Sequence, residues 1–159
     1  MVEDARFEDA QDGPLRLLAR AQDDLTIIST LLQDAVFPIS EMRWQPARRR
    51  FALLLNRFRW EDREQAERQH RDFERVQTLL VVGDVLKVSS SGIDRSDKDL
   101  ILSLLAIEFV PGEDGTGRLV LILAGDGAIA LDVECLEVSL QDATRPYVAP
   151  SKTAPDHPE

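Results

Sequence analysis

The residues of this chain best suited to bind a ligand are arginines, and most of them lie in one segment. Ten of the nineteen basic residues lie between Arg43 and Arg75, all ten are arginine, and six acids accompany them. The part from Arg43 to Arg59 has six arginines and no acid, which gives it a formal charge of +6. Guanidinium groups pair with carboxylates and phosphates through parallel hydrogen bonds. This segment is therefore the candidate binding surface of the chain.

The candidate binding residues are Arg48, Arg49, Arg50, Arg57, Arg59 and Trp60. Three interpretations remain open. The arginines pair with some of the chain's own 29 acids, or they bind an acidic protein partner or small anion, or they bind nucleic acid with aromatic rings stacking on bases. The net charge of −10 disfavours nucleic acid, because an acidic protein repels the phosphate backbone.

Catalytic chemistry has little support in the sequence. The two histidines, His70 and His157, lie in a charged stretch and in a proline-rich tail, where no packed wall excludes water. Cys135 is the one cysteine, and a free cysteine is usually a small apolar core residue. Asp132 and Glu134 share one face of an expected strand, which leaves weak cation binding or carboxylate chemistry as a distant alternative. We predict no catalytic residue, no metal site and no cofactor.

Length and composition indicate one domain of ordinary size in 159 residues. A lone cysteine fits a reducing compartment. The N-terminus is acidic and lacks the basic start and apolar run of a signal peptide. The longest apolar runs, such as Leu100–Ile107, are too short to span a bilayer. We therefore expect a cytoplasmic protein that does not enter membranes.

The expected boundaries are a loose acidic arm over residues 1–14, one domain over 15–143 and a proline-rich tail over 144–159. Leu15–Ala19 is typical of a short strand. Apolar residues spaced by three and four from Leu25 to Ala35 predict a helix that begins near Asp23 and ends at Pro38.

The middle of the chain favours strands. Phe51–Trp60 alternates in polarity, and one of its faces changes from apolar to cationic at Arg57, as expected of a strand that runs from the core to the rim. Glu61–Arg75 is nearly all charged or amide, and a solvated helix and a mobile excursion both remain open.

Two turn signals predict hairpins. Gly83-Asp84 separates Val76–Val82 from Val85–Ser91, and Gly125-Asp126-Gly127 separates Arg118–Ala124 from Ala128–Val133. After Cys135 the apolar positions change parity, which predicts a β-bulge or a short helix near Glu134–Leu136. The fold class is therefore α+β, with mostly antiparallel β-hairpins and one main helix near the N-terminus packed on the sheet.

Several runs resemble an uncharacterised bacterial family, domain of unknown function 2948. The runs are Ser29–Val36, Arg50–Glu61, Gly92–Asp97, Leu102–Ile107, Gly127–Ile129, Val133–Glu137 and Pro155–Pro158. The resemblance covers almost the whole chain, and it implies no known activity, cofactor or catalytic residue. We therefore expect a non-enzymatic cytoplasmic interaction or regulatory domain. The alternative is a nucleic-acid or phosphate-ligand binder that uses Arg48–Arg59, and the distant alternative is an enzyme with carboxylate chemistry.

Overall fold

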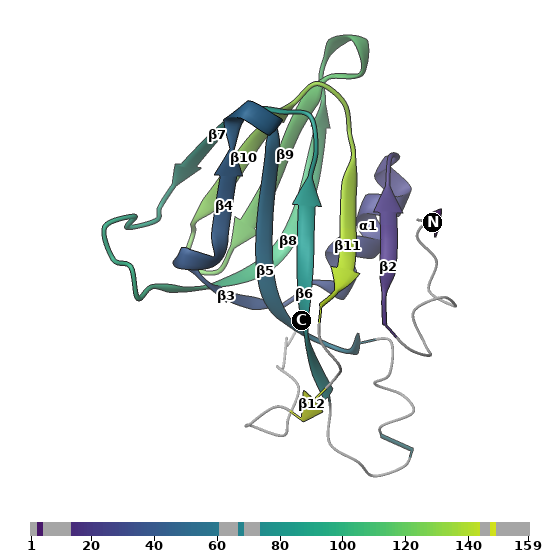
Figure 1. Ribbon diagram of the computed structural model, residues 1–159, viewed down its shortest axis with the longest axis vertical. Coiled ribbons are helices and arrows are strands. Elements are labelled where there is room, and N and C mark those ends of the chain that lie inside the picture. The colour runs from purple at the N-terminus through teal and green to yellow at the C-terminus, as the bar shows by residue number, and fades with distance from the viewer. Residues whose placement is uncertain (1–2, 5–13, 61–66, 69–73, 144–146, 149–159) are drawn as a thin grey trace.

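The structure is a computed structural model that describes residues 3–4, 14–60, 67–68, 74–143 and 147–148 (Figure 1). These residues form a mostly antiparallel β-structure with one α-helix, α1 (Gln22–Leu31). The strands are β1 (Glu3–Asp4), β2 (Arg16–Ala19), β3 (Val36–Pro38), β4 (Met42–Gln45), β5 (Arg50–Phe58), β6 (Glu74–Val82), β7 (Val85–Ser91), β8 (Ile101–Pro111), β9 (Gly117–Leu123), β10 (Ala128–Val133), β11 (Val138–Asp142) and β12 (Tyr147–Val148). Short 3-10 turns lie at η2 (Ile39–Glu41), η3 (Pro46–Arg48) and η5 (Glu113–Gly115).

The strands form one long sheet that folds over into two layers (Figure 1). Its order is β1-β2-β11-β6-β5-β3-β8-β9-β10-β7, and β4 and β12 pair with β5 and β6. The short strand β3 pairs with both β5 and β8, so it joins the layer of β2, β11, β6 and β5 to the layer of β8, β9, β10 and β7. Alternate residues of both layers point inward, as Leu53 and Leu55 do from β5 and Leu119 and Leu121 do from β9, and form one buried core.

The predicted apolar face of the helix is confirmed, but the helix is shorter than expected. Leu25, Ile28 and Leu31 are buried, and α1 packs against β2 and β8. The prediction that the helix continues to Ala35 is wrong, because Asp34 adopts a left-handed backbone with φ of 66° and donates its N–H to the Leu104 carbonyl oxygen at 2.8 Å. The chain has already joined β8 there, so Pro38 ends a strand and not a helix.

Of the two predicted hairpins, the second is confirmed and the first is wrong. β9 and β10 pair antiparallel along their whole length. β6 pairs with β5, β11 and β12, whereas β7 pairs with β10, so the chain crosses between the layers at Gly83-Asp84. The flanks of this crossing are fixed by bonds from Gly83 N–H to the Glu137 carbonyl at 3.0 Å and from Val85 N–H to the Arg49 carbonyl at 2.8 Å.

The change of parity in the apolar positions after Cys135 also results from a crossing between the two layers. Strand β10 belongs to one layer and β11 pairs with β2 and β6 in the other, so the chain crosses back between them. Ile129, Leu131 and Val138 all face the same core from opposite layers. The register shifts between Asp132 and Val133, and no helix forms near Glu134–Leu136.

Two segments with expectations from the sequence lie mainly outside the described residues, so these expectations stay predictions. Most of the Glu61–Arg75 segment and most of the 144–159 tail belong to this group. The described parts of the predicted arm and tail are strands, since β1 pairs parallel with β2 and β12 pairs with β6.

The face of β5 that turns cationic does not run out to a rim. Arg57 is completely buried, at 0% exposure. Its Nη2 lies 3.1 Å from each oxygen of Asp142, and its Nε donates to the Thr78 hydroxyl oxygen at 3.1 Å. Asp142 also accepts the Leu15 backbone N–H at 2.8 Å. The network therefore joins β5, β6 and β11 to the segment before β2, and every charge in it is compensated.

This network yields a stability prediction. Asp142→Ala leaves the Arg57 guanidinium buried without its counter-ion, which should lower the free energy of unfolding by about 3–5 kcal/mol. The matched control is Asp132→Ala, because Asp132 pairs with Arg118 at 2.8 Å on the surface and exposed pairs contribute up to about 1 kcal/mol. Urea denaturation measures both variants. Equal losses in the two would show that the buried network is not a major source of stability.

Candidate functional site

The six arginine-segment candidates do not form one surface. Arg57 is buried in the ion network, and Arg49 has a left-handed backbone with φ of 53° and pairs with Glu134 of the other layer. Arg59 and Trp60 are half-buried, and the indole N–H of Trp60 donates to the Gln33 carbonyl oxygen at 3.0 Å. Arg57, Arg49 and Trp60 therefore make hydrogen bonds or ion pairs within the chain, and the Arg49–Glu134 pair lies at the surface.

Arg48 and Arg50 are exposed. They lie at the turn η3 and at the first residue of β5. Of the six candidates, these two arginines are the ones that the structure leaves at the surface.

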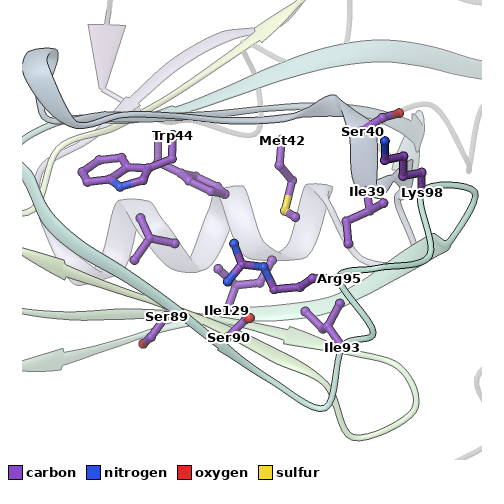
Figure 2. Close-up of a pocket in the computed structure, with 12 residues that line it drawn as sticks. Ile39, Ser40, Met42, Trp44, Ser89, Ser90, Ile93, Arg95, Lys98 and Ile129 are labelled. Carbon is purple, nitrogen blue, oxygen red and sulfur yellow. The ribbon is translucent and has the colours of Figure 1, made fainter.

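The structure instead contains a pocket of about 450 Å³. It lies between β4 and β7 (Figure 2), on the side of the sandwich away from α1, as the positions of these elements in Figure 1 indicate. Small-molecule sites typically measure about 300–1,000 Å³. The apolar lining residues are Ile39, Met42, Trp44, Phe51, Val88, Ile93 and Ile129. The polar ones are Ser40, Ser89, Ser90, Arg95 and Lys98. Among the described residues, no aspartate, glutamate, histidine or cysteine lines this pocket.

The pocket exists because two strand edges are left unpaired with each other. Within the described part of the chain, β4 pairs with β5 alone and β7 pairs with β10 alone. The layers are held together near the first residue of β7 by the Val85–Arg49 backbone bond and by the ion pair of Arg49 with Glu134. Beyond these contacts, Met42 and Trp44 of β4 face the β7 side across the opening (Figure 2).

Arg95 brings a positive charge into the pocket. Its side chain reaches into the opening between Met42 and Ile129 (Figure 2). Lys98 lies beside Ser40 at one end of the pocket, and Trp44 lies at the opposite end (Figure 2). In the region that the structure describes, neither Arg95 nor Lys98 makes a hydrogen bond or ion pair. A cation without a counter-ion beside an apolar wall is suited to receive an anion.

The loop between β7 and β8 positions Arg95 through contacts of its own. Gly92 has φ of +69°, and a Cβ there would lie 2.8 Å from the Asp126 carbonyl oxygen, so glycine suits both the backbone angle and the close approach. Asp94 accepts the Ser96 N–H at 3.1 Å and the Ser96 hydroxyl, and these bonds lower the pKa of Asp94. Asp97 accepts the Asp99 N–H at 3.1 Å. The first two acids of the loop thus fix its turns and do not pair with Arg95.

The other candidates from the sequence are surface features. Asp132 pairs with Arg118 and Glu134 pairs with Arg49, so the two carboxylates are engaged separately. His70 and His157 lie outside the described residues. Among the residues that are described, no cluster of three or more histidine, cysteine, aspartate or glutamate side chains could hold a metal ion. No helix in that part of the chain is long and apolar enough to cross a membrane.

A family model described as "Protein of unknown function (DUF2948)" matches residues 15–157. The chain belongs to this family. The resemblance seen in the sequence is thereby confirmed. No curated protein and no solved structure matches the chain. The function of this DUF2948 protein must therefore be argued from its own geometry.

Sequence reasoning missed the pocket. Its lining comes from η2, β4, β5, β7, β10 and the loop that follows β7. Met42 and Trp44 were visible as alternating apolar residues, and Ser89 and Ser90 stand out as small polar residues in a strand. Arg95 and Lys98 lie in a loop, where charged residues are common, so the sequence alone does not indicate that they line a pocket.

Cys135 gives a prediction about reactivity. Its thiol is exposed and donates to Asp84 Oδ2 at 3.0 Å, and this hydrogen bond, followed by burial, raises the pKa of Cys135 to about 11. A higher pKa leaves less thiolate at pH 8, so alkylation by iodoacetamide should be roughly a hundred-fold slower than in the unfolded chain. Asp84→Asn, which suits the left-handed backbone there (φ of 54°), should speed the reaction. A folded rate equal to the denatured rate would contradict this assignment.

Proposed function

We propose that this DUF2948 protein is a non-enzymatic binding domain that holds an anionic ligand in the pocket between β4 and β7. The observation that carries the proposal is the exposed Arg95 guanidinium, which enters a pocket lined by apolar side chains, three serines and Lys98, and has no counter-ion among the described residues. A charge-assisted hydrogen bond to an anion contributes about 1.5–3 kcal/mol. An anion would therefore gain more from this pocket than a neutral molecule of the same shape.

The chemistry of the lining supports binding without catalysis. Nucleophilic catalysis needs a nucleophile within hydrogen-bond reach of a base. The pocket offers the hydroxyls of Ser40, Ser89 and Ser90, and among the described residues its lining holds no carboxylate or imidazole to activate them. Arg95 stays protonated and cannot serve as a base. The lining residues, with their serine hydroxyls and two cations, are suited to hold and orient an anion.

The arginine segment gives weaker support to the alternatives. A nucleic-acid or phosphate binder that used Arg48–Arg59 could not use Arg57, because Arg57 is buried. An acidic protein partner stays a prediction that would rest on the exposed Arg48 and Arg50. A cytoplasmic location and a regulatory role likewise stay predictions.

The anionic dye 8-anilinonaphthalene-1-sulfonate tests the proposal on the full chain. Dye binding should shift the backbone NMR signals of Ser89, Ser90 and Ile93, which lie in or next to β7 at the pocket. Arg95→Glu should weaken binding by about ten-fold or more, because it removes a charge-assisted contact and adds repulsion.

The matched control is Arg48→Glu, which makes the same charge change at another exposed arginine and should alter the affinity less than about two-fold. Equal weakening by the two variants would mean that only net charge matters. Signal changes confined to other surfaces would place the site elsewhere. Either outcome would contradict the proposal.

A further inference from the structure

We infer that the ligand is an amphipathic acid, with a single carboxylate or phosphate head at the Arg95 end of the pocket and an apolar tail directed toward Trp44. This inference rests on the proposed function and specifies its ligand. It follows from the arrangement of charge along the pocket, from the composition of its walls and from the state of the β4 edge.

The two cations and the indole ring of Trp44 lie at different places along the pocket (Figure 2). Lys98 and Ser40 lie at one end, Arg95 reaches from that side toward the middle, and Trp44 lies at the far end (Figure 2). A small inorganic anion would contact the cations and leave the aromatic end unused. A neutral apolar molecule would leave the two cations without a counter-ion. A molecule with one charged end and one apolar end matches both halves.

The walls of the tail region come from both layers. Met42 and Trp44 extend from β4, and Val88 and Ile129 extend from β7 and β10. A tail between these walls is covered on two sides, and each methylene buried there should tighten binding by about four-fold. The gain should stop once the tail is longer than the pocket.

The head region suits a planar or tetrahedral oxyanion. The guanidinium group presents two parallel N–H donors to a carboxylate or a phosphate. Lys98 lies beside Ser40 at the end of the pocket from which Arg95 enters, and it adds a second positive charge to that half (Figure 2). The neighbouring Asp94 and Asp97 accept hydrogen bonds from the loop itself, so their oxygens are partly engaged before a ligand arrives.

An extended peptide fits the opening less well. A strand added beside β4 would need free carbonyl oxygens along that edge. Arg43 Nη1 already donates to the carbonyl oxygens of Ser40 and Met42, at the start of β4. An acidic peptide is therefore the competing occupant in the test and not the inferred one.

Calorimetric titration of the full chain, below the micelle concentration of each probe, tests the inference. The probes are decanoate, hexanoate, decyl phosphate, decan-1-ol, inorganic phosphate and an acidic decapeptide. Decanoate or decyl phosphate should bind at least about ten-fold more tightly than decanol, since only they reach the cations. They should also exceed hexanoate and inorganic phosphate by at least about ten-fold. The stronger of the two decyl acids identifies the head group.

Arg95→Gln supplies the residue-level test, with Arg48→Gln as the matched control. The first variant should weaken decanoate by about ten-fold and decanol by less than two-fold, and the second should change neither. A melting temperature equal to that of the unmutated chain shows that each variant is folded.

The opposite results would overturn the inference. Decanol that binds as tightly as both decyl acids, hexanoate that equals decanoate, or a peptide that binds more tightly than either acid would each exclude an amphipathic acid. If the sulfonate dye still binds in an Arg95-dependent way, only this inference fails. If the dye also ignores Arg95, the proposed function fails with it.

Discussion

The ion pair between Arg57 and Asp142 is the contact on which the layer of β2, β11, β6 and β5 depends. Both side chains are almost completely excluded from water. Such a pair is tolerated only when its remaining hydrogen-bonding groups are satisfied, and here Thr78, the Phe58 carbonyl oxygen and the Leu15 N–H complete it. One arginine of the cationic segment, Arg57, is thus paired inside the core. The anion that its charge suggested is, for Arg57, a carboxylate of the same chain.

Two crossings between the layers explain why a pocket lies on the opposite side. The chain leaves β6 for β7 at Gly83-Asp84 and returns from β10 to β11, so β7 becomes an outer strand of its layer. Strand β4 is the outer strand that faces it. The helix α1 packs on β2 and β8 and covers the other side of the sandwich. One side is therefore covered by a helix, and the pocket lies on the other.

The pattern of the sequence predicted the local elements better than their partners. The buried face of α1, the alternation of β5 and the β9–β10 hairpin follow from local spacing. Gly83-Asp84 has the residues of a hairpin turn. Such residues predict that the chain changes direction, but they do not predict which strands pair afterwards. The burial of Arg57 depends on Asp142, which is 85 positions away in the sequence. Arg95 is a candidate binding residue only because other segments of the chain form the walls of the pocket around it. Contacts between distant segments thus decide both the core ion pair and the candidate site.

We propose that the opening between β4 and β7 receives an anionic head at Arg95 and an apolar tail at Trp44. The most direct measurement is a crystal structure with 10-bromodecanoate, in which anomalous scattering locates the bromine at the end of the tail. The account predicts one bromine peak beside Trp44, with the carboxylate next to Arg95 and Lys98. A bromine peak outside this pocket, or a carboxylate that contacts neither cation, would contradict it.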